Sequence, residues 1–242
     1  MIVLYTDFSL NGPYVGQMKA VINDSSAKSV VIDLMHDAPK FNIRAAAYLL
    51  ASIIHTFPKN SVFLAVVDPG VGSLGRKPCV VKTDNAWFVG PDNGLFNRVV
   101  LESEGYKIWE IDIHGKNVSE SFHGRDVFAA IAAQIDQHPV FDGIAYTPAI
   151  NNDDWPESLF EVIYSDHFGN VMTGVKAISL STSDIICING HQLTFARTFS
   201  EVPVGDAFWY VNSNAMIEFS VNQGRADLLL NVAIGNTFFV KR

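Results

Sequence analysis

The sequence predicts an α/β N-terminal domain, with a mostly parallel sheet between helices, followed by a smaller C-terminal all-β barrel domain. Over residues 1–150, short apolar runs alternate with stretches of helical periodicity, as strands alternate with helices in α/β folds. The polar, turn-rich segment "PAINNDDWP" then separates this part from one rich in short strand-like runs. We therefore expect an α/β domain over residues 1–150 and a β-barrel domain over residues 157–242.

The first three apolar runs, "IVLYT", "SVVIDLM" and "SVFLAVVD", are typical of strands that are buried on both faces of a parallel sheet. The first two lead into predicted helices, from about Tyr14 and from about Asn42. In the second helix the apolar residues follow the i, i+3, i+4, i+7 spacing of one helix face. These residues are Ile43, Ala46, Ala47, Leu50 and Ile54.

The third run leads into "VVDPGVGSLGR", whose Gly70, Gly72 and Gly75 have G-x-G-x-x-G spacing. A dinucleotide site requires a helix to begin at the last glycine, because the pyrophosphate binds to that helix N-terminus. Here Pro78 and a β-branched run follow and predict another strand, so the dinucleotide interpretation fails. The stretch remains a strand end, where open α/β sheets bind ligands, although Asp68 could also be an ordinary turn residue before Pro-Gly.

Two further local predictions concern turns and caps. Asn189-Gly190 lies between two strand-like runs and indicates a type I′ hairpin. "AFWYVNSNAMIEFSV" predicts a second hairpin, and "TFFVKR" a last strand. In "GPDNGLF", Asp92 or Asn93 is expected to cap the helix that follows.

Composition excludes several classes of function. The 242 residues carry a formal charge of −8 with no Lys/Arg block, so nucleic acid is not an expected partner. The longest apolar run, "AAAYLLASIIHTF", is shorter than the roughly 20 residues that span a bilayer, and "MIVLYTDF" lacks a basic leader, so we expect a cytoplasmic protein without membrane insertion. The two cysteines, Cys79 and Cys187, lie far apart without further ligands at metal-site spacing, which predicts neither a disulfide nor a metal site.

Seven segments together resemble the S-adenosylmethionine (SAM) hydroxide adenosyltransferases, the adenosine-forming SAM hydrolases related to the SAM-dependent fluorinase and chlorinase. They are "YTDF…YVGQMKAVI", "DLMHDAPKFNIRAAA", "VVDPGVGS…R", "FVGPDNGLF", "FHGRDVFA", "SDHFGNVMTG" and "NSNAMIEFSVNQGRA". The resemblance implies hydrolysis of SAM to adenosine and L-methionine without a cofactor. It also implies a homotrimer whose sites lie between one subunit's N-terminal domain and a neighbour's C-terminal domain.

The resemblance implies a role for six residues of the N-terminal domain. Asp68, Arg76 and His123 match the set around the attacking water. Asp7 matches the carboxylate that holds the ribose hydroxyls, and an ionised carboxylate can accept two hydroxyl hydrogen bonds. Phe41 and Phe122 match aromatic walls of the site.

Five C-terminal residues complete the implied substrate site. Asp166, Phe168 and Asn170 of "DHFGN" resemble contacts to adenine and the methionine part, and Ser213 and Asn222 match polar positions near the methionine carboxylate and the adenine.

The implied reaction suits these side chains. The sulfonium already activates C5′ of SAM and leaves as a neutral thioether, so the chemical demand falls on the water, which must be oriented and deprotonated. We expect Asp68 and His123 to orient the water and accept or relay its proton, and Arg76 to stabilise developing hydroxide. No metal is required.

Two alternatives remain beside hydrolysis. A halogenase of this family places a serine for the halide where this chain has Gly124, which favours water as the nucleophile. A SAM- or adenosine-binding module with little turnover is the other. The chain also departs from the family pattern at Ser9, at Gly12 in place of an aspartate near the methionine ammonium, and by one additional residue before Arg76.

Overall fold

The computed structural model describes residues 1–73, 76–114 and 118–242 and divides the chain into two compact units. The N-terminal unit comprises residues 1–50 and 54–150, and the C-terminal unit residues 51–53 and 151–242. Within the described ranges, no helix is long and apolar enough to cross a membrane.

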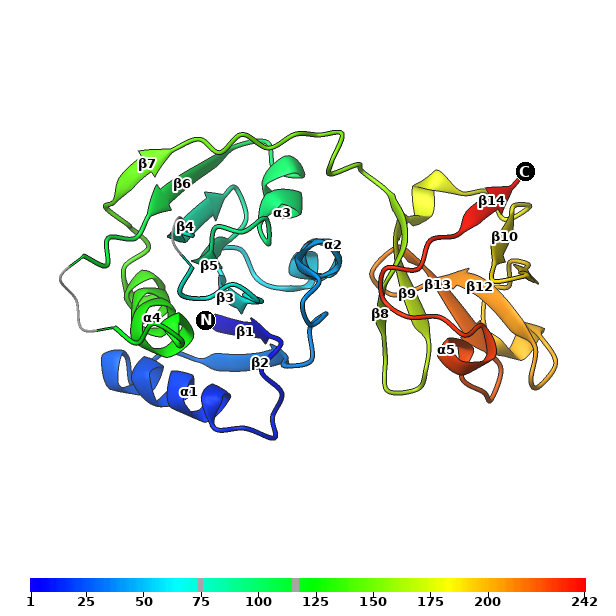
Figure 1. The fold of residues 1–242 in the computed structure, drawn as a ribbon, viewed down its shortest axis with the longest axis horizontal. Coiled ribbons are helices and arrows are strands. Elements are labelled where there is room, and N and C mark those ends of the chain that lie inside the picture. Colours follow the sequence, from blue (N-terminus) through cyan, green and yellow to red (C-terminus); the bar gives the residue numbers. More distant parts are fainter. Residues whose placement is uncertain (74–75, 115–117) are drawn as a thin grey trace. The chain divides into compact units, whose positions relative to one another are not determined.

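A seven-stranded sheet forms the centre of the N-terminal unit, in the order β2-β1-β3-β5-β4-β6-β7 (Figure 1). Its strands are β1 (Ile2–Thr6), β2 (Val31–Met35), β3 (Val62–Val66), β4 (Pro78–Thr83), β5 (Trp87–Pro91), β6 (Tyr106–Glu110) and β7 (Ile144–Tyr146). The strand predicted to follow the glycine pattern is β4, so the dinucleotide interpretation is rightly excluded.

The sheet is mixed, so the expectation of a mostly parallel sheet is only partly correct. Strands β2, β1, β3 and β5 are parallel neighbours, whereas β4 pairs antiparallel with β5 and with β6, and β6 pairs antiparallel with β7. The three residues 84–86 that join β4 to β5 permit only a hairpin, because a parallel connection needs a crossover of about a dozen residues or more.

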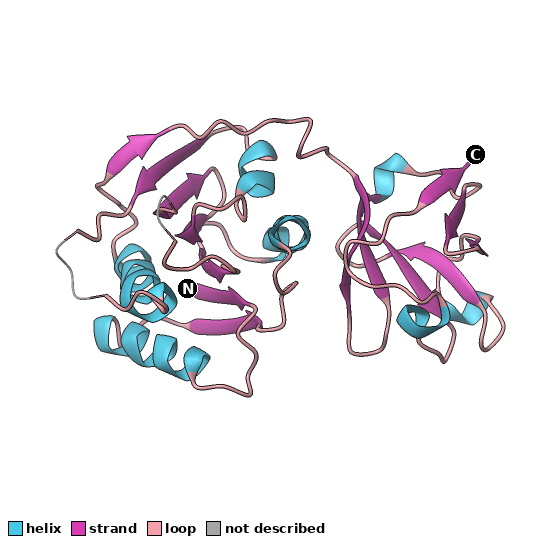
Figure 2. Ribbon diagram, viewed as in Figure 1, coloured by secondary structure: helices cyan, strands magenta, loops and turns pink. Residues whose placement is uncertain are grey.

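Helices cover both faces of this sheet, with α1 and α4 on one face and α2 and α3 on the other (Figure 2). The helical segments are α1 (Tyr14–Ser25), α2 (Ile43–Ile53), η1 (Ile54–Thr56), α3 (Asn97–Leu101), the π-helical turn η2 (Gly124–Phe128) and α4 (Ala129–Gln137). The predicted starts of α1 and α2 are confirmed. The Asn42 side chain caps α2 by accepting a hydrogen bond from the Ala45 backbone N–H at 3.0 Å.

Alternate strand residues separate the two layers of the core. Ile2 and Leu4 of β1 belong to the cluster that packs against Met18 of α1 and Ala132 of α4. On the opposite face, the Tyr5 hydroxyl donates a hydrogen bond to a backbone carbonyl of α2. This two-sided burial explains why the parallel strands are continuous apolar runs.

Two antiparallel sheets form the C-terminal unit. One has the order β12-β13-β9-β8 and the other β11-β10-β14. The strands are β8 (Leu159–Ser165), β9 (Val171–Lys176), β10 (Ile185–Ile188), β11 (His191–Leu193), β12 (Ala207–Val211), β13 (Met216–Val221) and β14 (Phe239–Lys241). Short helical turns η3 (Ala177–Ser179), η4 (Phe199–Glu201) and α5 (Ala226–Leu229) connect them.

The predicted hairpins and last strand of this unit are confirmed, but the predicted barrel is not seen as a continuous ladder. Asn189 and Gly190 have φ of 46° and 82°, as a type I′ turn requires. Single bridges, Phe195 with Trp209 and Glu161 with Thr237, link the edges of the two sheets. The ladders between the described strands are all antiparallel, the Phe195 bridge to Trp209 is parallel, and no continuous ladder between the two sheets closes a barrel.

Candidate active site

A pocket of about 230 Å³ lies in the N-terminal unit, beyond the carboxyl end of β3 and at the N-terminal end of η2. The position agrees with the rule that open α/β sheets bind ligands at the carboxyl ends of their strands. Its wall includes two predicted catalytic residues, Asp68 and His123. The other lining residues are Phe8, Tyr14, Val66, Val71, Ser121, Phe122, Gly124 and Phe128.

Asp68 lies just past β3 and is paired with Arg76. Its side chain is only 8% exposed, and its Oδ1 accepts a hydrogen bond from Arg76 Nη1 in an ion pair. A Cβ at Gly70 would lie 2.7 Å from the Arg76 guanidinium, so a larger residue there would require this side chain to shift from its present position. Leu74 and Gly75 lie outside the described residues, and Arg76, which follows them, is paired with Asp68.

Asn93 fixes the backbone that leads to Asp68. Its Nδ2 donates a hydrogen bond to the Val67 carbonyl at 2.9 Å, and its Oδ1 accepts one from the Leu95 N–H at 3.1 Å. The expectation that Asp92 or Asn93 caps a helix is therefore wrong. Helix α3 begins later, after Phe96 and without a side-chain cap, because Asn93 is occupied with the end of the neighbouring strand.

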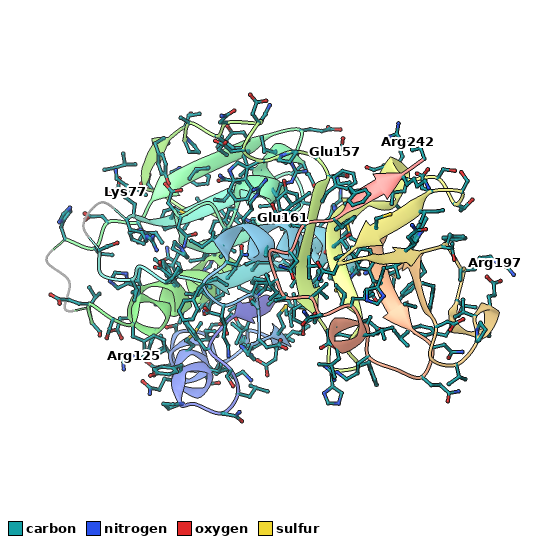
Figure 3. The ribbon with its side chains drawn as sticks, turned by 45° about the vertical axis from the view of Figure 1, so that its right-hand side comes forward. Lys77, Arg125, Glu157, Glu161, Arg197 and Arg242 are labelled. Carbon is teal, nitrogen blue, oxygen red and sulfur yellow. The ribbon has the colours of Figure 1, made fainter. Side chains whose placement is uncertain are left out.

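His123 directly precedes the π-helical turn η2, and such turns are frequent at functional sites. Among the described residues no group hydrogen-bonds the imidazole, so its ring nitrogens are available to a molecule in the pocket. Arg125, labelled in Figure 3, is the second residue of η2. It links η2 to α1, because its Nη1 donates to Gln17 Oε1 at 2.8 Å while its Nε donates to the Asp126 carboxylate.

Three aromatic rings form one side of the pocket. Phe122, predicted as a wall, packs against Tyr14 and Phe8, with ring centroids 5.2 Å and 5.8 Å away. Neither Phe8 nor Tyr14 is among the predicted site residues. Their positions, directly after Asp7 and at the start of a helix, do not distinguish a pocket wall from core packing. An aromatic surface of this kind can attract a cation such as a sulfonium.

Asp7 lies at the end of β1, near enough to Asp68 for their charges to interact. Burial raises the pKa of Asp7 above its usual 3.8, and the Asp68 carboxylate adds to this effect. The Asp7 backbone N–H and the Lys40 ammonium oppose it. Next to Lys40, Phe41 is 81% exposed with a left-handed φ of 59°, a conformation that is rare for a bulky residue and points to a functional constraint.

A second pocket, of about 500 Å³, lies in the C-terminal unit and includes Phe168 and Asn170 in its wall. Asp166 holds Asn170 twice, accepting hydrogen bonds from its backbone N–H at 2.9 Å and its Nδ2 at 2.8 Å. The Ser220 hydroxyl donates to Asn170 Oδ1 at 2.7 Å, which fixes the orientation of the amide. The structure thus brings Asp166, Phe168 and Asn170 together.

Asn222 and Ser213 lie at opposite ends of β13. Asn222 is next to two pocket-lining residues, Val221 and Gln223, and its Nδ2 donates to the Val202 carbonyl at 2.7 Å. Ser213 is exposed in the turn between β12 and β13. Within the C-terminal unit, Asn222 therefore joins the Phe168 and Asn170 group, and Ser213 does not.

Comparison with known protein families matches both parts of the chain. Residues 2–144 match the model of the SAM hydroxide adenosyltransferase N-terminal domain, and residues 160–238 that of the C-terminal domain.

Curated relatives named (R)-S-adenosyl-L-methionine hydrolase match along nearly their whole length. The protein of Methanocaldococcus jannaschii is 35% identical over 96% of this chain and 92% of its own, and that of Thermus thermophilus is 32% identical over 95% of both. The protein of Salinispora arenicola is 33% identical over 96% of this chain and 94% of its own.

Solved structures agree with these matches. An uncharacterized conserved protein from Thermotoga maritima has a TM-score of 0.89 at 32% identity over all of both chains. A conserved hypothetical protein from Thermus thermophilus has a TM-score of 0.77 at 30% identity over 99% of both. Sequence and fold agree over almost the full length, and the chain belongs to the SAM hydroxide adenosyltransferase family.

Proposed function

We propose that this chain hydrolyses SAM to adenosine and L-methionine. The observation that carries the proposal is the presence of Asp68, paired with Arg76, and of His123 in one aromatic-walled pocket. Curated relatives with the name SAM hydrolase, at 31–35% identity over nearly the full chain, support the same reaction.

In the proposed step a water oxygen attacks C5′ of SAM as the bond from C5′ to sulfur breaks. The electron pair of that bond leaves with sulfur as the neutral thioether of methionine, so no acid is needed for the leaving group. The water proton passes to His123, whose ring has no hydrogen-bond partner among the described residues. Asp68 accepts a hydrogen bond from the water and orients it, and the ion pair with Arg76 holds that carboxylate in place.

Water is favoured over halide because Gly124 offers no side-chain hydroxyl in the pocket. A Cβ at this position would lie 3.2 Å from the Phe122 ring and 3.4 Å from Met18 Sδ. The site is therefore closely packed around this glycine, and even an added methyl group would require the Phe122 ring to shift by a few tenths of an ångström.

The N-terminal pocket is too small to enclose SAM by itself. Its volume of about 230 Å³ lies below the roughly 300–1,000 Å³ typical of sites for ligands of this size. We infer that Asp7, Phe41 and Phe122 hold the ribose side, and that Asp166, Phe168, Asn170, Ser213 and Asn222 supply the adenine and methionine contacts. As the family resemblance implies, a homotrimer would bring the C-terminal residues of one subunit to the N-terminal pocket of another.

The substrate epimer is a further part of the proposal. Sulfur in SAM carries three different carbon substituents and is a stereocentre, and the names of the curated relatives specify the (R) form. We therefore expect this chain to prefer (R)-SAM.

The deciding experiment incubates the purified protein with each SAM epimer, with and without chloride. Adenosine, methionine and 5′-chloro-5′-deoxyadenosine are followed by chromatography. Adenosine and methionine in equal amounts, lost in the His123→Ala variant, would support the proposal. Formation of 5′-chloro-5′-deoxyadenosine in the presence of chloride would indicate a halogenase. SAM binding by calorimetry without any product would overturn the enzyme assignment and leave a binding module.

A further inference from the structure

A chain of four polar side chains runs from α1, through β2 and the residue after it, to the end of β1. Lys19 Nζ binds Asp33 Oδ2 at 2.5 Å, and Asp33 Oδ1 lies 3.1 Å from His36 Nε2. His36 Nδ1 lies 2.8 Å from Thr6 Oγ1. The His36 side chain is 3% exposed and Thr6 is fully buried, so their hydrogen bond to each other replaces hydrogen bonds to water.

The Asp33 carboxylate is the acceptor at the centre of two of these contacts. Burial acts to raise the pKa of Asp33, but hydrogen bonds from Lys19 and His36 outweigh it and hold that pKa below its usual value. In the tautomer that carries a hydrogen on Nε2, His36 donates to the Asp33 carboxylate and its Nδ1 accepts the Thr6 hydroxyl. Thr6 Oγ1 in turn accepts the Phe8 backbone N–H at 3.4 Å.

The same residues fasten the two loops that leave β1 and β2. The Ser9 N–H donates to the His36 carbonyl at 2.6 Å, and the Ala38 N–H donates to the Thr6 carbonyl at 3.1 Å. Ser9 has a left-handed φ of 62°, so its loop turns back sharply toward β2. Asp7 lies between Thr6 and Phe8, and its backbone is therefore held on both sides.

We propose that His36 is a positioning residue, which acts through Thr6 to hold the Asp7 carboxylate toward the ribose hydroxyls and the Phe8 ring toward the pocket. It touches no substrate in this assignment. The inference rests on the proposed function through Asp7, and it adds to that function a residue that lies outside the pocket wall.

The test compares Thr6→Val, which keeps the shape and removes the hydroxyl, with Thr6→Ser, which keeps the hydroxyl. Adenosine binding is measured by calorimetry, because adenosine carries the ribose diol and needs no turnover. Thr6→Val should weaken adenosine binding and raise KM for SAM by about tenfold, the effect of one lost hydrogen bond, while kcat changes by less than about threefold. Thr6→Ser should restore both values to near wild type.

A purely structural role would lower the melting temperature of Thr6→Val but leave the adenosine Kd and KM unchanged well below that temperature, and this result would overturn the inference. If Thr6→Val does not fold, Asp33→Ala at the exposed end of the chain decides, because it removes the acceptor for His36 Nε2, with Asp24→Ala on α1 as its matched control. An Asp33→Ala variant that binds adenosine like Asp24→Ala would also overturn the inference. Wild-type protein that binds adenosine but releases no methionine would instead count against the proposed function.

Discussion

Arg76 determines what Asp68 can do. The nearly buried Asp68 carboxylate is bound to the Arg76 guanidinium, and this pair fixes the direction in which its free oxygen can accept a hydrogen bond. His123 lines the same pocket, and its imidazole has no hydrogen-bond partner among the described residues. The proposed function therefore gives the two residues separate roles, in which Asp68 would orient the water and His123 would accept its proton.

Replacement of either residue should affect turnover rather than binding. We expect His123→Ala and Asp68→Asn each to lower kcat by about 100-fold or more, while the SAM Kd stays within about threefold of wild type. Single-turnover methionine release and calorimetry measure the two quantities. His191→Ala, on an exposed strand of the C-terminal unit, is the matched control and should change neither. A parallel loss of binding and rate would contradict the assigned roles.

Ionised Asp7 should lower the free energy of unfolding, although the proposed function needs its carboxylate to bind the ribose hydroxyls. Burial raises the pKa of Asp7, so the folded protein favours the protonated carboxyl and disfavours the ionised one. Protonated Asp7 therefore contributes to the free energy of unfolding at low pH, and this contribution is lost as the pH rises through the folded-state pKa. Asp7→Asn should therefore unfold at higher urea concentration than wild type at pH 7, with a difference that shrinks as the pH is lowered toward the usual pKa of an aspartate. Its adenosine affinity should fall. A variant less stable than wild type at pH 7 would refute this account.

At the scale of elements, two glycines allow the effect of backbone conformation on stability to be measured without a change in packing, because both have open surroundings. A Cβ at Gly190 in the β10–β11 turn would meet nothing within 4 Å, but its φ is +82°. A Cβ at Gly16 in α1 would also meet nothing, and there the backbone is helical. Gly190→Ala should therefore destabilise the protein by about 1 kcal/mol, and Gly16→Ala should stabilise it by about 0.5–1 kcal/mol. Urea titrations of both variants measure the effects, and equal signs would contradict this explanation.

The sequence predicts elements well where burial is complete and poorly where pairing depends on distant segments. Strands β1 and β3 are fully buried, so their apolar runs are unmistakable. Strand β6 begins with the exposed Tyr106 and Lys107, and its antiparallel place beside β4 is set by tertiary pairing. The predicted sheet is therefore correct in its parallel half and wrong in the other.

The same distinction holds for the candidate site. Asp68 and His123 follow motifs that can be found in the sequence, and they do line one pocket. Phe8 and Tyr14 could not be separated in advance from aromatic residues of the core, because their role depends on three rings meeting in space. Ser213 and Asn222 are close in sequence but separated by the length of β13.

At the scale of the whole molecule, the division of the predicted site between two units leads to a test of assembly. The N-terminal pocket carries His123 and the C-terminal pocket carries Phe168, which is 73% exposed and can be replaced without disturbing a core. If sites form between subunits of a homotrimer, His123→Ala and Phe168→Ala chains can complement each other. A site is intact only when its N-terminal half comes from a Phe168→Ala chain and its C-terminal half comes from a His123→Ala chain.

Random assembly of equal amounts should make about a quarter of the sites intact, because each half has one chance in two of being wild type. We therefore expect co-refolded variants, assayed at low SAM concentration, to recover about a quarter of wild-type activity, whereas each variant alone has little. Light scattering of the same samples measures the mass of the assembly. If the co-refolded variants have a trimeric mass but recover no activity, each site is built from a single chain. If the wild-type protein is fully active at a monomeric mass, the homotrimer itself is excluded.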